Sequence, residues 1–237
     1  INYRYQDLAF LLNTLKQGRL DDGSVNPFKN NIDFEKVGAM GHSMGGGTTY
    51  IAMLKNNEVK AGVALDGWFF GLLDEDANTN TKKPFLHMGQ EQFLDTSIDG
   101  DINGSKDGKR NFEIYNTILN TNKESYGVYI KNSLHYSYTD MKLIYNQGAP
   151  FSLPLDSLGE VDKKIVDKVM DKTVLDFFNY SLKGQPINFK KNDTYNSQVI
   201  YNQHPWRHSP STKIFFIVEN QKKLPKKHWH LRKQSSI

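Results

Sequence analysis

A short apolar run that ends in a glycine-rich turn and continues into a helical pattern most constrains the fold of this chain. Lys36–Met40 is apolar and bounded by polar residues, as expected of a buried strand. The turn is Gly41–Gly45, with the sequence GHSMG, and it leads through two further glycines into Thr48–Lys55, whose spacing suits a helix. Such a strand–turn–helix unit predicts a parallel sheet that is covered by helices.

Further apolar runs and helical patterns alternate along the chain. Strands are predicted at Lys60–Leu65, Phe85–Met88 and Tyr126–Ile130, and helices at Asp7–Lys16, Asn111–Leu119 and Val161–Leu182. Gly18–Asn31 and Glu91–Gly108 are rich in turn-forming residues and are predicted to be loops. The alternation predicts an α/β fold with a mostly parallel sheet and helices on both of its faces.

Composition excludes several classes of protein. The 237 residues include no cysteine, which rules out disulfides, thiolate zinc sites and a cysteine nucleophile. No continuous apolar stretch approaches the roughly 18–20 residues of a membrane helix. Beyond residue 203 lie eight of the 30 Lys and Arg residues but only one of the acidic residues. The high pI of the chain therefore comes from this tail. It does not predict a nucleic-acid partner for the rest of the chain. We divide the chain into a folded domain at 1–202 and a basic tail at 203–237.

The serine at the centre of the turn is the predicted nucleophile. A sharp turn between strand and helix lifts the hydroxyl of Ser43 above the sheet, and glycines two residues before and after it relieve the crowding. The same turn directs the backbone N–H of Met44 toward a developing oxyanion. A serine hydroxyl needs a base, and His135 is the histidine that follows a strand downstream of the nucleophile. His42 is expected to pack or hydrogen-bond, and His87 to lie in the core.

Three acids compete for the role of orienting His135. Asp66 ends the strand after the turn, Glu91 lies just past the next strand, and Asp95 is a weaker third candidate. Each preserves the chain order nucleophile, acid, histidine that is typical of this chemistry. Spacing alone does not choose among them, because an aspartate at a strand end is often only a helix cap.

Three segments resemble the plasma-type platelet-activating factor acetylhydrolase family and its bacterial relatives. They are Asp33–Gly46, which contains the turn, Ala64–Phe70 with the sequence ALDGWFF, and Lys83–Leu86. The resemblance extends over roughly residues 1–185 and implies an α/β-hydrolase fold. In that family the aspartate of the Ala-Leu-Asp-x-Trp segment is the acid, which implies Asp66. The family histidine precedes aromatic residues, as His135 does here.

The resemblance also implies elements that are not visible in this chain. The family carries several strands before the helix that starts at Asp7, and an upstream loop that supplies a second oxyanion N–H. We therefore expect the chain as given to lack its N-terminal strands and to be truncated relative to a working enzyme. The tail matches no known pattern, and its His228–His230 segment is not expected to bind a metal.

The expected function is serine carboxylic-ester hydrolysis through an acyl-enzyme, without cofactor or metal. The substrate is expected to be a small or lipid-like ester with a short or oxidised acyl group, and Trp68 and Phe69 are expected to line its pocket. One alternative is a cutinase or polyester-type hydrolase with Glu91 as acid. Another is an inactive hydrolase-fold fragment. The sequence leaves the oligomeric state open, and also the compartment, with a lean to a secreted or cell-surface location.

Overall fold

The computed structural model describes residues 1–93, 105–146, 158–187 and 199–203 of the chain. The elements, in chain order, are α1 (Asn2–Lys16), η1 (Phe34–Lys36), β1 (Val37–His42), α2 (Met44–Lys55), β2 (Val59–Leu65), α3 (Asp74–Ala77), β3 (Phe85–Gln90), η2 (Glu91–Phe93), α5 (Lys106–Thr121), β4 (Ser125–Ile130), η3 (His135–Tyr138), α6 (Met141–Asn146), α7 (Lys163–Lys183) and β5 (Val199–Gln203). None of the helices in these ranges has the length and apolar character needed to cross a membrane.

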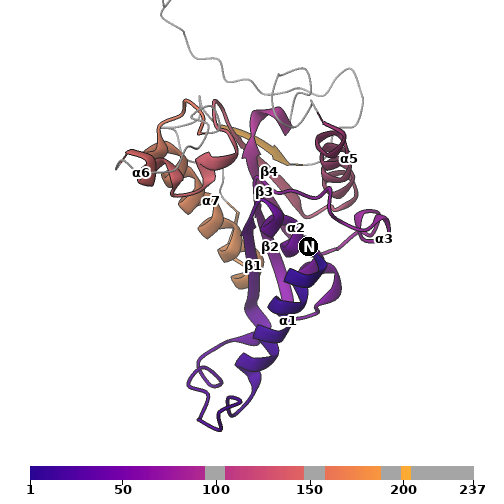
Figure 1. The fold of residues 1–237 in the computed structure, drawn as a ribbon, viewed down its shortest axis with the longest axis vertical. Coiled ribbons are helices and arrows are strands. Elements are labelled where there is room, and N and C mark those ends of the chain that lie inside the picture. Colours follow the sequence, from indigo (N-terminus) through magenta and orange to yellow (C-terminus); the bar gives the residue numbers. More distant parts are fainter. Residues whose placement is uncertain (94–104, 147–157, 188–198, 204–237) are drawn as a thin grey trace, which may run out of the picture.

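The strands form one five-stranded sheet in the order β1-β2-β3-β4-β5 (Figure 1). The first four are parallel, which confirms the predicted mostly parallel sheet, and β5 runs antiparallel to β4. No pattern in the sequence had marked β5 as a strand. Within the described ranges β1 is hydrogen-bonded to β2 alone and lies at the edge of the sheet.

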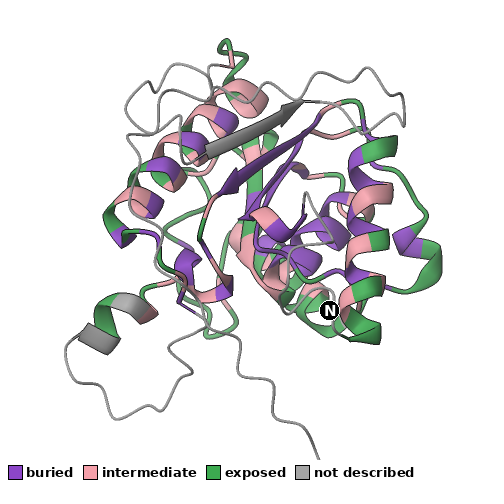
Figure 2. Ribbon diagram, turned by 90° about the horizontal axis from the view of Figure 1, so that it is seen from above, coloured by how far each residue is buried: buried purple, intermediate pink, exposed green. Residues whose placement is uncertain are grey.

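Helices cover both faces of the sheet, as predicted. In Figure 1, α1, α2 and α5 lie on one side of the strands and α7 lies on the other. Each side has its own core. One includes Tyr50 from α2, Phe85 from β3 and Ile118 from α5, and the other includes Val63 from β2 and Phe177 from α7. The strands β2, β3 and β4 between these layers are the most deeply buried part of the described molecule, whereas the edge strand β1 is only partly buried (Figure 2).

The carboxyl ends of neighbouring strands meet along one edge of the sheet. His42 at the end of β1 pairs with Leu65 at the end of β2, and Leu65 pairs with Met88 of β3. Gln90 at the end of β3 pairs with Ile130 at the end of β4. Residues that directly follow these strands are therefore gathered at one place, where open α/β sheets carry their functional groups.

Several predicted boundaries were wrong, and the largest errors lie at the starts of two helices. The first helix begins at Asn2 rather than Asp7, because Tyr5 packs on the same core as Leu8 and Leu12 further along the helix. The predicted loop at 91–108 ends earlier than expected, because α5 begins at Lys106. The hydroxyl of Ser105 accepts a hydrogen bond from the backbone N–H of Gly108 at 2.9 Å and caps this helix.

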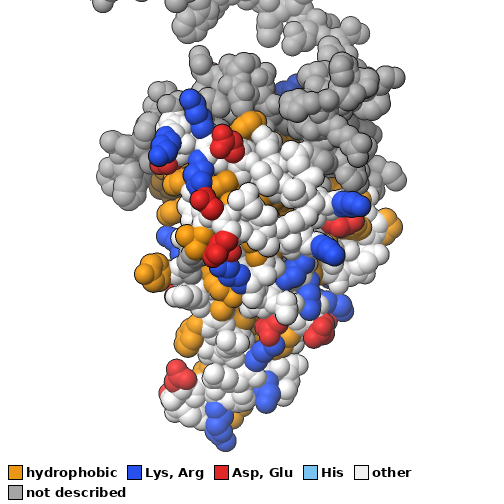
Figure 3. All heavy atoms as spheres, turned by 90° about the vertical axis from the view of Figure 1, so that its right-hand side faces the viewer, with side chains coloured by type: hydrophobic (Ala, Val, Ile, Leu, Met, Phe, Trp, Pro, Cys, Tyr) orange, Lys and Arg blue, Asp and Glu red, His pale blue; other side chains and the backbone are white. Residues whose placement is uncertain are grey.

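Acidic and basic side chains are interspersed on the face in Figure 3, which lies on the right-hand side of Figure 1. On the described part of this face they do not form a block of one sign. The basic tail from residue 204 onward, with His228–His230, lies outside the described residues, and so does Asp95.

Candidate active site

Ser43 occupies the sharp turn between β1 and α2. Its backbone angles are φ 59° and ψ −126°, a strained conformation that residues other than glycine rarely adopt. The N–H of Ser43 donates to the carbonyl of Leu65 at 3.0 Å, and its own carbonyl accepts from the N–H of Trp68 at 2.9 Å. The Ser43 hydroxyl makes no capping bond to α2. The turn is therefore tied on both sides to the end of β2, and the hydroxyl is not used to cap the helix.

The glycines around Ser43 have unequal roles. A Cβ added at Gly41 would lie 2.4 Å from the carbonyl carbon and oxygen of Gly45, so the turn requires glycine there. A Cβ added at Gly45 would have no heavy atom within 4 Å, so the expectation that both flanking glycines relieve crowding is wrong for Gly45. Gly46 lets α2 approach the sheet, because a Cβ there would lie 2.9 Å from that of Ala64.

Asp66 follows β2 directly and is fully buried, with a positive φ of 44°. Its Oδ1 accepts a hydrogen bond from the backbone N–H of Gln90 at 3.1 Å, and its Oδ2 accepts from the side-chain amide of Gln90 at 3.1 Å. The third partner is Nδ1 of His135, at 2.6 Å from Oδ2. A buried carboxylate needs such donors to offset its lost hydration. Gln90 was missed by the sequence analysis, although it is the polar residue at the end of β3.

His135 begins η3, in the loop that follows β4, and is 8% exposed. Because the carboxylate of Asp66 is the partner of Nδ1, this nitrogen carries the proton and Nε2 is left able to accept one. The indole ring of Trp68 stacks on the imidazole with 4.7 Å between ring centroids and 19° between planes. Asp66 and His135 are 69 residues apart in the sequence, and each was predicted from its own segment. The structure brings them into direct contact.

His42 contacts His135, and His87 contacts the residue that follows Asp66. Nε2 of His42 is 2.9 Å from the main-chain oxygen of His135, so the expected packing and hydrogen-bonding role is confirmed. His87 is fully buried in the core, as predicted, and its Nε2 accepts a hydrogen bond from the N–H of Gly67 at 3.3 Å. Burial lowers the pKa of His87 to about 4, so its imidazole is neutral at pH 7.

Glu91 does not lie where an acid that orients His135 would, and Phe69 does not lie at a pocket. Oε1 of Glu91 accepts a hydrogen bond from the N–H of Asn132 at 3.3 Å, whereas the carboxylate that contacts His135 is that of Asp66. Phe69 is fully buried and packs on Tyr50 and Phe85, so it belongs to the core and does not line a substrate pocket. Trp68 is 37% exposed and remains available to a substrate.

Two side chains of α5 fix the loop that carries Trp68. Asn111 accepts hydrogen bonds from the N–H groups of Phe69 and Phe70 and donates to the carbonyl of Gly67. Arg110 donates to the carbonyls of Phe70 and Leu72. Neither residue was expected from the sequence, because the contacts join segments about forty residues apart.

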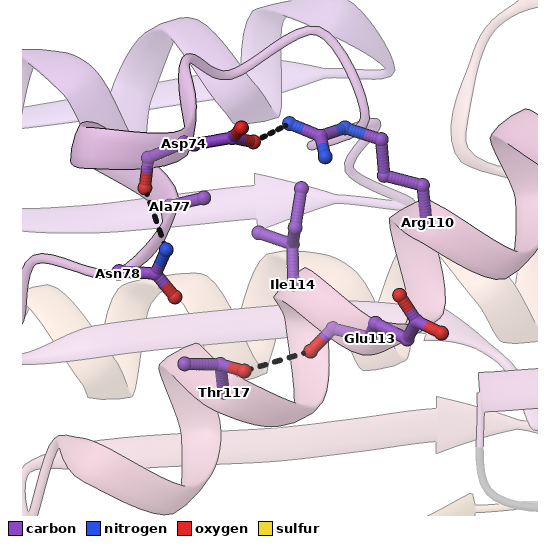
Figure 4. A pocket seen from close by; sticks show the side chains of 7 residues that line it. All are labelled: Asp74, Ala77, Asn78, Arg110, Glu113, Ile114 and Thr117. Atoms are coloured by element: carbon purple, nitrogen blue, oxygen red, sulfur yellow. Dashed lines mark hydrogen bonds and ion pairs between the residues drawn. The ribbon is translucent and has the colours of Figure 1, made fainter.

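The hollow between α3 and α5 belongs to this same scaffold. It has a volume of about 210 Å³, and its lining residues are Asp74, Ala77, Asn78, Arg110, Glu113, Ile114 and Thr117 (Figure 4). Figure 4 shows the guanidinium of Arg110 across from Asp74, which it meets at 2.7 Å. None of Ser43, Asp66 and His135 lines this hollow, so we assign it to the support of the loop rather than to the chemistry.

The chain is similar to one family of known proteins. It matches the family described as platelet-activating factor acetylhydrolase, isoform II, over residues 14–200. Curated proteins named platelet-activating factor acetylhydrolase match from Cavia porcellus, with 25% identity over 73% of this chain and 35% of the relative, and from Gallus gallus, with 28% identity over 60% and 30%. The relative from Bos taurus is 22% identical over 83% of this chain and 40% of its own length. The chain thus spans about a third of the length of these relatives.

A solved structure described as a ferulic acid esterase from Streptomyces cinnamoneus is similar in fold. The TM-score is 0.61 at 22% identity, and the likeness covers 84% of this chain and 54% of that one. At this identity the likeness establishes the fold alone. Together with the parallel sheet and its helices, it confirms the predicted α/β-hydrolase fold.

Proposed function

We propose that this chain, which belongs to the platelet-activating factor acetylhydrolase, isoform II family, carries the catalytic centre of a serine ester hydrolase. Ser43 is the nucleophile, His135 the general base and Asp66 the residue that orients His135. The observation that carries the proposal is the 2.6 Å contact between Nδ1 of His135 and the fully buried carboxylate of Asp66. It lies at the same sheet edge as a strained serine turn, which is the arrangement that activated serines require.

The proposed reaction proceeds through an acyl-enzyme. Nε2 of His135 takes the hydroxyl proton as the oxygen of Ser43 bonds to the ester carbonyl carbon, and the carbonyl oxygen becomes an oxyanion. The imidazolium then gives the proton to the departing alkoxide, so the alcohol leaves. Water attacks the acyl-serine with the same proton transfers in reverse order and releases the acid. Asp66 holds the imidazole in its Nδ1–H form throughout.

The backbone N–H of Met44 is the proposed oxyanion donor. Met44 is the first residue of α2, so its N–H has no partner within the helix and lies at the positive end of the helix dipole. Removing one such donor typically costs about 10²–10³ in rate. Gly46 supports the position of this donor, because it lets the first turn of α2, where Met44 lies, approach the sheet closely.

We propose an ester with an apolar acyl or alcohol part as the substrate. Trp68, Phe70 and Met44 are at least partly exposed near the triad, with ring centroids of Trp68 and Phe70 5.6 Å apart. Apolar side chains of this kind suit a lipid-like ester. The curated relatives are named for hydrolysis of an acetyl group of platelet-activating factor, which makes an acetyl ester a candidate substrate. A cutinase-type site with Glu91 as acid has less support, since Glu91 bonds to Asn132.

A fluorophosphonate probe tests the proposal, since it reacts covalently with an activated serine and needs no knowledge of the natural ester. We expect stoichiometric labelling, with the adduct located on Ser43 by peptide mass spectrometry and abolished in Ser43→Ala. Absence of labelling in the folded full-length protein would overturn the proposed function in favour of an inactive hydrolase fold.

A further inference from the structure

His42 makes its hydrogen bond to the main chain of the proposed base, and its ring also packs against the imidazole of that base. Its Nε2 lies 2.9 Å from the backbone oxygen of His135, and the two rings are tilted by 37° with centroids 4.5 Å apart. A carbonyl oxygen accepts hydrogen bonds and never donates them. Nε2 of His42 therefore carries a proton, and this nitrogen is not available to act as a base.

The place of His42 in the fold gives this bond a consequence. His42 is the last residue of β1 and directly precedes Ser43, whereas His135 arrives after β4, three strands away in the sheet. The contact with Asp66 fixes the Nδ1 end of the imidazole, and the bond from His42 fixes the backbone to which the imidazole is attached. Two attachments at different points define the position of a side chain better than one.

We propose that His42 is a positioning residue, which holds the loop of the base His135 at a fixed place relative to the adjoining nucleophile Ser43. This inference rests on the proposed function and adds a fourth residue to its machinery. A displacement of about 1 Å between reacting groups costs up to about 100-fold in rate, so a single hydrogen bond that prevents it has a measurable effect.

The ionisation of His42 is compatible with this role. Burial lowers the pKa of His42, and the neighbouring imidazole of His135 lowers it further, while the hydrogen bond to the backbone of His135 and the carboxylate of Asp66 act in the opposite direction without reversing the shift. His42 thus favours its neutral form, which keeps the Nε2–H donor without placing a second positive charge beside the imidazolium that forms on His135 during the reaction.

Three variants separate the hydrogen bond from packing. His42→Gln supplies an amide N–H at about the distance from Cα of the histidine Nε2, whereas His42→Leu fills the space with an apolar side chain and removes the donor. Lys36→Gln, at the exposed last residue of η1 directly before β1, is the control. The second-order rate constant for fluorophosphonate labelling of Ser43 is expected to fall by about 10- to 100-fold in His42→Leu. His42→Gln should recover most of that loss, and Lys36→Gln should match the wild type.

A second measurement does not depend on reactivity. The Nδ1 proton of His135, bonded to Asp66, should give a strongly downfield NMR signal, assigned by its loss in Asp66→Asn. We expect the signal to broaden by solvent exchange in His42→Leu and to persist in His42→Gln. If Ser43 fails to react in the wild type but the signal follows this pattern, the proposed function fails and the positioning role stands. A sharp signal in His42→Leu, or wild-type labelling by that variant, overturns the positioning role.

Discussion

His87 accepts a hydrogen bond from the backbone N–H of Gly67 through Nε2, at 3.3 Å and with no exposed surface. Gly67 is the residue after Asp66, so this bond supports the strained turn on which the proposed acid lies. The bond exists only while Nε2 is unprotonated, because a protonated nitrogen no longer accepts.

The first prediction concerns stability in acid. The pKa of His87 is lowered by burial to about 4, against 6.5 in the unfolded chain, so the unfolded state binds more protons between these values. Above pH 6.5 the contribution of His87 to the free energy of unfolding is complete. It falls by about 3 kcal/mol as the pH drops from 6.5 toward 4, and it no longer changes below pH 4. Urea unfolding at several pH values measures it. His87→Gln should remove this part of the slope, and an unchanged slope would contradict the buried neutral histidine.

The second prediction separates the two candidate acids. Asp66→Asn should lower the rate constant for hydrolysis of a p-nitrophenyl ester, or for fluorophosphonate labelling, by about 10⁴, since the neutral amide no longer stabilises the imidazolium. Glu91→Gln should react at close to the wild-type rate, because the carboxylate of Glu91 accepts its hydrogen bond from the backbone of Asn132 and not from His135. A larger loss in Glu91→Gln would instead identify a cutinase-type site.

The sheet and the turn at Ser43 could be predicted because their signals are local. A buried parallel strand is a short apolar run, and the glycine pattern around the serine is read from adjacent residues. The strand β5 could not be predicted, since it is defined by antiparallel pairing with β4, some seventy residues earlier. Local sequence carries no record of such a partner.

The site could be predicted less completely, because its supporting contacts join distant segments. Asp66 and Glu91 both follow strands, and only the fold places one of them at 2.6 Å from His135. Trp68 and Phe69 are adjacent in an irregular loop, where no periodicity assigns a side chain to the core or to solvent. Trp68 is 37% exposed, whereas Phe69 is fully buried. The expectation that both line the substrate pocket was therefore wrong for Phe69.

The third prediction compares the two glycines that flank Ser43. Gly41→Ala should lower the free energy of unfolding by about 1–3 kcal/mol, because its Cβ would lie 2.4 Å from the backbone of Gly45. Gly45→Ala meets open space within a helix and should leave stability unchanged or raise it by up to about 1 kcal/mol. Chemical denaturation of both variants tests the contrast, and equal losses would contradict the unequal roles.

The fourth prediction concerns the loop that presents Trp68 to His135. Asn111 is 4% exposed and bonds to three backbone groups of this loop, belonging to Gly67, Phe69 and Phe70. Asn111→Leu has a similar volume but leaves these groups buried without a partner, so the free energy of unfolding should fall by about 2–4 kcal/mol. Asn120→Leu, on the exposed side of the same helix, is the matched control and should change it by no more than about 0.5 kcal/mol.

Hydrogen exchange distinguishes a local effect of Asn111 from general destabilisation. The amides of Phe69 and Phe70 donate directly to Asn111, so they should exchange faster in Asn111→Leu than its global stability accounts for. Amides of β2 and β3, which pair within the sheet, should follow global stability alone. Because Trp68 stacks on His135, labelling of Ser43 should slow in the same variant. Unchanged exchange at Phe69 and Phe70 would show that Asn111 does not hold the loop.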